Sequence, residues 1–171
     1  VTQDTLHPIA TVQGDTLIDC TKNAVALNSL LTDTSRYQLI WTKPDQTQIK
    51  DSVKIKSNLS GKYTLTVIDK KNYCQDTRDW NVKVDSLFPQ IDLGSDLVID
   101  CKNNGVNIMP TETSQTGMFG YYWNLPTGTL NKETKLLDKI STQSGQVILK
   151  VINEQNGCAT SDTLEIKDVR Q

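Results

Sequence analysis

The sequence contains one stretch twice. Residues 61–69 read Gly-Lys-Tyr-Thr-Leu-Thr-Val-Ile-Asp and residues 145–153 read Gly-Gln-Val-Ile-Leu-Lys-Val-Ile-Asn, and a cysteine follows each copy, Cys74 and Cys158. In both copies alternate positions are apolar, which is the period of a half-buried β-strand. A duplicated strand with matched flanks predicts a module that occurs twice, and a tandem-repeat architecture follows from it.

Other features recur in step with this strand. The pattern Trp-x-x-Pro starts at Trp41 and again at Trp123. Short apolar runs separated by turn residues indicate about seven strands in each copy, with the spacing of a β-sandwich. We therefore predict an all-β chain of two tandem β-sandwich repeats, residues 1–86 and 87–171. The tryptophans are predicted to be core residues, and a sugar-stacking surface is the alternative.

The four cysteines allow three pairings. If each repeat closes on itself, the expected pairs are Cys20–Cys74 and Cys101–Cys158, one disulfide per repeat. Each would stabilise its repeat by about 4 kcal/mol in the chain-entropy model, and domains of about 80 residues often need such a cross-link. The alternatives are buried free thiols and a zinc site, which lacks support because the sequence has no Cys-x-x-Cys and a single histidine, His7.

The segment that enters the first repeat resembles the junction between the repeats. Residues 1–8 read Val-Thr-Gln-Asp-Thr-Leu-His-Pro, and residues 82–89 read Val-Lys-Val-Asp-Ser-Leu-Phe-Pro. By analogy, residues 1–8 would be the tail of a further repeat, so we expect the chain to be part of a longer array. The junction contains Pro89 and no glycine, which predicts a limited hinge rather than a flexible tether.

Composition argues against several classes of function. The net charge is −2, whereas a nucleic-acid binder usually carries a basic face. No apolar run approaches the roughly 18 residues of a membrane span. The sequence shows no nucleophile elbow, phosphate loop or histidine metal motif, so we expect neither catalysis nor a cofactor.

The run from Gly61 to Asp69, with Cys74 and the Asp-Thr of residues 76–77 after it, resembles the immunoglobulin-like and PKD-like repeats of secreted Bacteroidota proteins. The turn at residues 156–158, Asn-Gly-Cys, fits that class, whereas Tyr73 replaces the glycine in the first copy. The resemblance covers both repeats. It implies the extracellular stalk of a large surface adhesin, including those of gliding bacteria exported by the type IX system. Neighbouring repeats of the same chain would be its partners, and a surface polysaccharide is a candidate ligand.

Two alternatives accompany this resemblance. An antibody-type domain is a poorer match, because it would have a tyrosine two residues before its second cysteine, where Asn72 and Asn156 stand. The second alternative is a carbohydrate-binding accessory module of a secreted hydrolase. Exposed aromatic side chains on one sheet face would favour it, and the candidates are Tyr37, Tyr121 and Tyr122.

Acidic residues gather at predicted turns, and some are weak calcium candidates because calcium prefers carboxylate oxygens near turns. These are Asp15, Asp19, Asp96 and Asp100. The competing interpretation is ordinary turn aspartates, and a melting temperature unaffected by millimolar calcium would reject the metal site.

Five segments run Asp, then Ser or Thr, then an aliphatic residue, which resembles the O-glycosylation signal of secreted Bacteroidota proteins. The predicted acceptors are Thr5, Thr16, Ser52, Ser86 and Thr163. Chance is the competing explanation, since strands alternate polar and apolar residues. An unmodified mass of natively produced protein would reject the sites.

Overall fold

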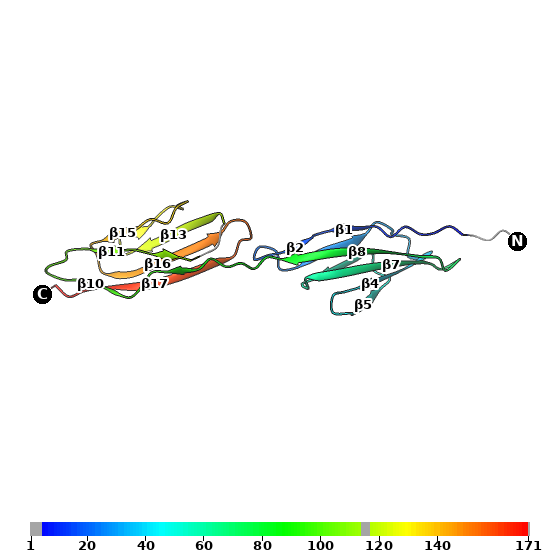
Figure 1. Cartoon of the computed structure of the whole chain (residues 1–171), viewed down its shortest axis with the longest axis horizontal. Helices are drawn as coiled ribbons and strands as arrows, with labels where there is room; N and C mark the ends of the chain where they lie inside the picture. Colours follow the sequence, from blue (N-terminus) through cyan, green and yellow to red (C-terminus); the bar gives the residue numbers. More distant parts are fainter. Residues whose placement is uncertain (1–4, 114–116, 171) are drawn as a thin grey trace. The chain divides into compact units, whose positions relative to one another are not determined.

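The computed structural model describes residues 5–113 and 117–170, and these residues form β-strands and no helix. The chain divides into two compact units, Val1–Asp85 and Ser86–Gln171 (Figure 1). Residues 1–4, part of the segment compared above with the junction, lie outside the described residues.

Unit 1 is built from two sheets. Its strands are β1 (Val12–Gly14), β2 (Leu17–Ile18), β3 (Val25–Ser29), β4 (Tyr37–Thr42), β5 (Gln48–Lys50), β6 (Lys54–Ser57), β7 (Gly61–Asp69) and β8 (Gln75–Val84). One sheet has the order β1-β3-β6 and the other β2-β8-β7-β4-β5. All pairs are antiparallel except β2 with β8, where Ile18 lies opposite Val84.

Unit 2 repeats this plan. Its strands are β9 (Ile91–Asp92), β10 (Leu97–Ile99), β11 (Val106–Ile108), β12 (Thr111–Glu112), β13 (Phe119–Leu125), β14 (Gly128–Thr129), β15 (Lys139–Ser141), β16 (Gly145–Asn153) and β17 (Ala159–Asp168). The larger sheet has the order β10-β17-β16-β13-β14, and β11 pairs with β15 and β9 with β12. Again one pair is parallel, β10 with the end of β17.

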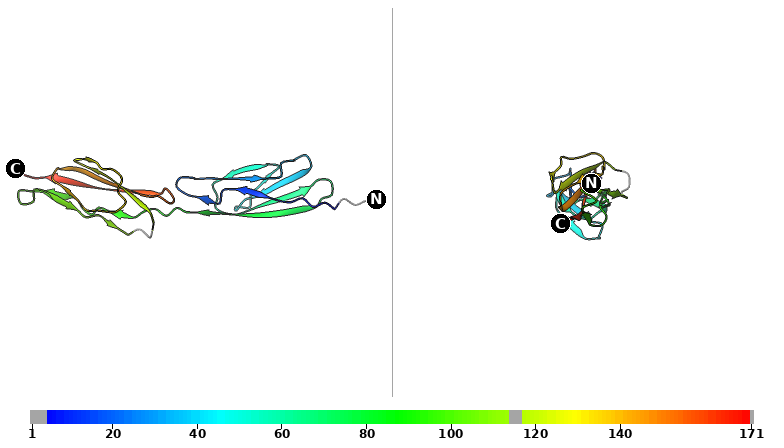
Figure 2. Two further views of the ribbon diagram at one scale, coloured as in Figure 1. Left: turned by 90° about the horizontal axis from the view of Figure 1, so that it is seen from above. Right: turned by 90° about the vertical axis from the view of Figure 1, so that its left-hand side faces the viewer.

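This strand order is that of an immunoglobulin-like sandwich. In unit 1 the N-terminal strand is divided between the sheets, since β1 pairs with β3 and β2 crosses to pair with β8. The long hairpin of β7 and β8 dominates the larger sheet, and Figures 1 and 2 show β8 (green) running along it. Greek-key connections between two antiparallel sheets define this fold. The prediction of an all-β chain of two sandwiches is therefore confirmed.

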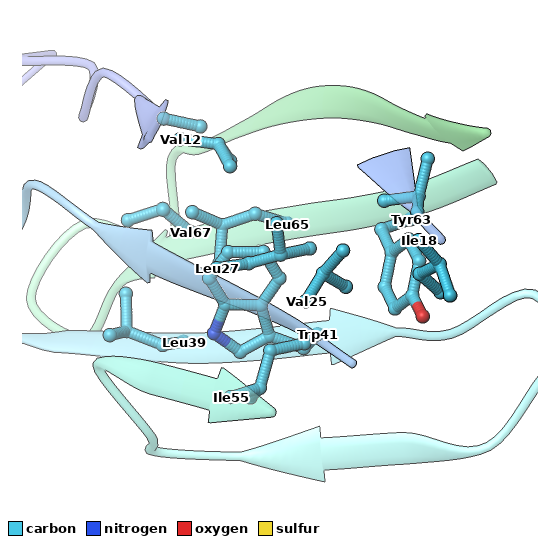
Figure 3. Packing of buried hydrophobic residues seen from close by; sticks show 12 residues of the cluster. Val12, Ile18, Val25, Leu27, Leu39, Trp41, Ile55, Tyr63, Leu65 and Val67 are labelled. Carbon is cyan, nitrogen blue, oxygen red and sulfur yellow. The ribbon is translucent and has the colours of Figure 1, made fainter. Parts of the chain in front are cut away.

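The duplicated strand forms the centre of each core. Tyr63, Leu65 and Val67 on β7 are fully buried, and so are their counterparts on β16. Trp41 on β4 is also fully buried, and its Nε1–H donates to the carbonyl oxygen of Ser52 at 2.8 Å. Figure 3 shows the Trp41 indole among the surrounding aliphatic side chains. Both tryptophans are therefore core residues and not a sugar-stacking surface.

Unit 1 also carries a tyrosine corner. The hydroxyl of Tyr63, near the start of β7, donates to the carbonyl oxygen of Leu59 at 2.6 Å, four residues upstream. Antibody domains have such a tyrosine two residues before a core cysteine. Here Leu65 occupies that cysteine position. Counting back two residues from Cys74 gives Asn72, so the sequence pattern did not predict the tyrosine corner at Tyr63.

The glycine that opens each duplicated strand lies against the proline of Trp-x-x-Pro. Gly61 has φ +124°, and a Cβ placed on it would lie 3.0 Å from Cβ of Pro44. Gly145 has φ +135°, and the corresponding distance to Pro126 is 3.4 Å. Two motifs that recur separately in the sequence thus meet in space. The φ value favours glycine at both positions, and at Gly61 the close approach of Pro44 favours it as well.

The prediction of one internal disulfide per repeat is wrong. Cys74 and Cys101 are free thiols, and Cys20 and Cys158 are disulfide-bonded. Neither Cys20–Cys74 nor Cys101–Cys158 is therefore formed.

The long last strand of each unit explains why. Cys74 directly precedes β8, whereas Cys20 follows β2, which pairs with the far end of β8. At about 3.3 Å per residue, these positions lie about 30 Å apart, and a disulfide needs Cα atoms within about 7 Å. In unit 2, Cys158 and Cys101 are separated along β17 in the same way.

Candidate functional site

The cysteines of each repeat occupy two kinds of turn, and these turns are the candidate functional site. We call Cys20 and Cys101 the loop cysteines, since each follows the short second strand of its unit. We call Cys74 and Cys158 the hairpin cysteines, since each lies in the turn between the two longest strands. Each repeat therefore has one cysteine of each kind, at opposite ends of its sandwich.

An aspartate shapes the turn of each loop cysteine. Oδ1 of Asp19 accepts hydrogen bonds from the backbone N–H groups of Thr21 and Lys22, both at 2.8 Å. Oδ1 of Asp100 accepts from Lys102 at 2.8 Å and from Asn103 at 2.7 Å. The two turns have the same hydrogen bonds around their cysteines, so the backbone presents both thiols in the same way.

An asparagine shapes the turn of each hairpin cysteine. Oδ1 of Asn72 accepts from the N–H of Cys74 at 2.9 Å, and Oδ1 of Asn156 accepts from that of Cys158 at 2.9 Å. In both turns the carbonyl oxygen of the cysteine accepts the N–H of the last residue of the preceding strand. The hairpins are thus equivalent although Tyr73 replaces a glycine; its φ of +59° is the left-handed conformation that glycine would adopt freely.

The same asparagines bind the segment that enters each repeat. Nδ2 of Asn156 donates to the carbonyl oxygen of Leu87 at 3.1 Å, and Leu87 belongs to the junction sequence. Nδ2 of Asn72 donates to the carbonyl oxygen of Leu6 at 2.9 Å. Leu6 therefore takes in unit 1 the place that the junction residue Leu87 takes in unit 2.

A buried carboxylate distinguishes the first hairpin from the second. The side chain of Asp69, the last residue of β7, is almost fully buried and accepts two hydrogen bonds from the Arg36 guanidinium, at 2.7 and 2.9 Å. The pKa of Asp69 is lowered from its usual value. The largest contribution is the hydrogen bond from the backbone N–H of Lys71, and Arg36 adds to it, whereas burial acts in the opposite direction. In unit 2 the neutral Asn153 replaces this aspartate, and its Oδ1 accepts from Gln155.

We expect Asp69 to make unit 1 the acid-sensitive half of the chain. A carboxylate whose pKa is lowered by folding stabilises the fold above its unfolded pKa of about 3.9, and this contribution is lost as pH falls through the lower folded pKa. Asp69→Asn should lower the urea midpoint of unit 1 at pH 7 and bring no further loss in strong acid. Urea titrations at several pH values, followed by amide exchange in β7, measure this effect.

Unit 2 is the internal control for that experiment, because Asn153 already lacks the charge. Its β16 amides should respond to acid equally in the wild-type chain and in Asp69→Asn. If the urea midpoint measured at β7 fell with decreasing pH by the same amount in the wild-type chain and in Asp69→Asn, the assigned role of Asp69 would be contradicted.

The calcium candidates have structural partners. Asp15 accepts the N–H of Ala26 at 3.0 Å and pairs with the Lys22 ammonium. Asp96 accepts the N–H of Glu165 at 3.0 Å and lies 3.5 Å from Nζ of Lys167. As described above, Asp19 and Asp100 shape the loop turns. Within residues 5–113 and 117–170, no group of three or more His, Cys, Asp or Glu side chains is placed to hold a metal ion. Calcium binding at the four aspartates stays a prediction.

Most predicted glycosylation positions are accessible. Thr5, Thr16, Ser86 and Thr163 are exposed. Ser52 is half-buried, and its hydroxyl donates to the carbonyl oxygen of Lys54 at 2.6 Å. Glycosylation stays a prediction at all five residues, and Ser52 is the acceptor that the local structure favours least.

The aromatic candidates for sugar binding differ in exposure. Tyr121 is 5% exposed, and its hydroxyl donates to Oε2 of Glu112 at 2.5 Å. Burial, assisted by Glu112, raises the pKa of this phenol. The guanidinium carbon of Arg36 lies 5.2 Å from the ring centroid of Tyr37. Tyr122 is half-buried. Tyr121 is therefore unavailable for stacking on a sugar.

No protein-family model matches the chain, and no curated protein matches its sequence. Solved structures similar to it include three N-terminal domains of the Highly Immunogenic Outer Capsid protein of bacteriophage RB49, at 15% identity and TM-score 0.47, covering 93% of this chain and 58% of that one. The fibronectin(III)-like modules of Clostridium thermocellum CbhA match at 12% identity and TM-score 0.41, covering 92% of this chain and 95% of theirs. Sidekick-1 immunoglobulin domains 1–5 match at 12% identity and TM-score 0.41, covering 97% of this chain and 41% of that one.

These matches concern tandem sandwich modules, and the strand order of each unit is what establishes its fold here. The chain spans 58% of the length of the phage protein structure, the first of these relatives. No helix in the described part of the chain is long and apolar enough to cross a membrane.

Proposed function

We propose that the chain is a non-catalytic segment of a large secreted or cell-surface bacterial protein, in which immunoglobulin-like repeats follow one another as a stalk or adhesive filament. The adhesins of gliding Bacteroidota, exported by the type IX system, are the class that the sequence resembles. In this function the repeats themselves form the stalk or filament, and their partners are neighbouring repeats of the same chain.

The observation that carries this proposal is the shared contact of the hairpin asparagines. Asn156 binds Leu87 of the junction, and Asn72 binds Leu6 in the same way. In both units the hairpin binds the segment that enters the unit. This shared contact supports the proposal that each repeat is preceded by another repeat in the native protein. The disulfide-bonded cysteines and the immunoglobulin-like fold support an extracellular setting, because disulfides persist in oxidising compartments.

Labelling of intact cells that produce the protein natively tests the proposal. A membrane-impermeant amine reagent should modify exposed lysines of this chain, such as Lys62 and Lys167, before the cells are lysed. The purified product should have a mass well above 19.1 kDa and contain further copies of the repeat.

Two outcomes would contradict the proposal. Labelling that occurs only after lysis would remove the cell-surface setting. Specific binding on a glycan array that is lost in Tyr122→Ala would support the accessory module of a secreted hydrolase instead, and a catalytic domain in the same gene product would strengthen that alternative.

A further inference from the structure

The dipeptide Asn-Gly occurs twice in the sequence, both times in unit 2, at Asn104-Gly105 and at Asn156-Gly157. In such a pair the backbone nitrogen of the glycine can attack the side-chain amide carbon of the asparagine. Glycine favours this reaction because it has no Cβ to obstruct the approach and it restricts the backbone least. Whether a given pair reacts therefore depends on how firmly the fold holds the attacking nitrogen and the amide.

The fold holds both reacting groups of the second pair. Asn156 is 1% exposed, and its side-chain amide is bound at both ends, through Nδ2 to Leu87 and through Oδ1 to Cys158. The N–H of Gly157 donates to the carbonyl oxygen of Asn153 at 2.7 Å. The reaction would break these hydrogen bonds in a buried place, where their loss is costly, so this pair is protected.

The first pair lacks these restraints. Asn104 and Gly105 end the loop that leads from Cys101 to β11, and Asn104 is exposed. The hydrogen bonds that Asp100 accepts in this loop end at Asn103. In the described part of the chain, neither the Asn104 amide nor the Gly105 N–H has a hydrogen-bond partner. The amide is therefore able to turn toward the glycine nitrogen.

The matching loop of unit 1 provides an internal comparison. Both loops have the same hydrogen bonds around the aspartate that precedes their cysteine. Counting from this aspartate, Asn23 corresponds to Asn104 and Ala24 corresponds to Gly105. Asn23 is also exposed, but the Cβ of Ala24 obstructs the approach to its backbone nitrogen. The two loops therefore place an exposed asparagine alike and differ in the residue that would attack it.

We propose that Asn104 is a site of spontaneous deamidation and that Asn23 and Asn156 are not. The nitrogen of Gly105 loses its proton and forms a bond to Cγ of Asn104, and the side-chain nitrogen leaves as ammonia. The resulting succinimide adds water at either of its carbonyl groups, which opens the ring to aspartate or isoaspartate. The net change is the uptake of water and the loss of ammonia, so no oxidant or cofactor takes part. The chain gains one negative charge.

Isoaspartate would alter the fold next to the site. It carries the main chain through the former side chain and so adds a methylene group directly before β11. The backbone is closely packed there, since a Cβ on Gly105 would lie 3.2 Å from the carbonyl oxygen of Ser141. The pair of β11 and β15 is three residues long. We therefore expect isoaspartate to loosen this pair and to leave unit 1 unchanged, so that unit 2 carries a covalent record of its age.

Long incubation of the 171-residue chain in mildly alkaline buffer, followed by peptide mass spectrometry, tests the proposal. Asn104 should deamidate at least about tenfold faster than Asn23 or Asn156, which corresponds to a barrier lower by about 1.4 kcal/mol. An isoaspartyl methyltransferase should label the peptide that contains residue 104. In Gly105→Ala the rate at Asn104 should fall to that of Asn23.

The reverse substitution tests the same explanation in the other unit. Ala24→Gly should make Asn23 reactive, and unchanged amide protection in β7 and β16 would show that both variants are folded. Asn104→Asp supplies the charge without the extra methylene, so it should keep the protection of β11 that the isoaspartyl form loses.

Two results would overturn the proposal. One is deamidation of Asn104 no faster than that of Asn23 in the wild-type chain. The other is a rate at Asn104 that Gly105→Ala leaves unchanged in folded protein. Neither result bears on the tandem function, because the proposal concerns a single loop and makes no use of neighbouring repeats.

Discussion

Trp41→Ala is expected to destabilise unit 1 strongly while the stability of unit 2 is unchanged. The side chain is fully buried between the two sheets, as Figure 3 shows, and its removal takes away packing and leaves a cavity. Such truncations cost about 3–5 kcal/mol, and a unit of this size has a total stability of about 4–13 kcal/mol. Amide exchange in β7 and β16 during a urea titration reports the two units separately. In the variant only β7 should lose protection at a lower urea concentration than in the wild-type chain.

Conservative variants of both tryptophans give a matched control. Trp41→Phe keeps an aromatic ring but loses the hydrogen bond to Ser52. Trp123 is equally buried, but its Nε1 has no acceptor among the described residues, and Nζ of Lys139 lies 5.7 Å from its ring. Trp41→Phe should therefore destabilise its unit more than Trp123→Phe does. Equal losses would show that the hydrogen bond contributes nothing measurable.

Gly61→Ala should produce the second largest loss of stability, again confined to unit 1. An L-residue at φ +124° is strained, and the new Cβ would also lie 3.0 Å from Cβ of Pro44. Strain of this kind costs about 1–3 kcal/mol. The pyrrolidine ring has to move, so we expect the upper part of that range. The urea midpoint of unit 1, measured by amide exchange in β7, is the readout.

Two other glycines separate strain from contact. Gly128 has φ +128° and nothing within 4 Å of its Cβ position, so Gly128→Ala measures the conformational cost alone. In Gly145→Ala the contact with Pro126 is an ordinary 3.4 Å. The loss should decrease from Gly61 to Gly145 to Gly128. If Gly128→Ala lost as much stability as Gly61→Ala, the contact with Pro44 would not contribute to the effect at Gly61.

The parts of the fold that could be predicted from the sequence were those with a local signal. The period-two run from Gly61 to Asp69 matches β7, and the run from Gly145 to Asn153 matches β16. Alternation places one face of a strand in the core whatever its partners are, so the buried residues could be predicted as well. The tryptophans followed from the same pattern.

The cysteine connectivity could not be predicted, because it depends on which end of the sandwich each turn occupies. The spacing between Cys20 and Cys74 does not reveal that β2 pairs with the far end of β8. That pairing is a contact between distant segments, and it places the two thiols about 30 Å apart. The hydrogen bond of Tyr63 with Leu59 could not be predicted for a related reason, because Cys74, from which its position would be counted, lies outside the core cluster.

Cys158 is fully buried in its hairpin turn, but none of the four cysteines belongs to either hydrophobic core cluster. Leu65 stands where an antibody domain has a core cysteine, so oxidation is not a condition for the sandwich to form. We therefore expect each domain to fold under reducing conditions, before any disulfide forms. A reductant applied to the finished protein would then leave the architecture of every domain intact.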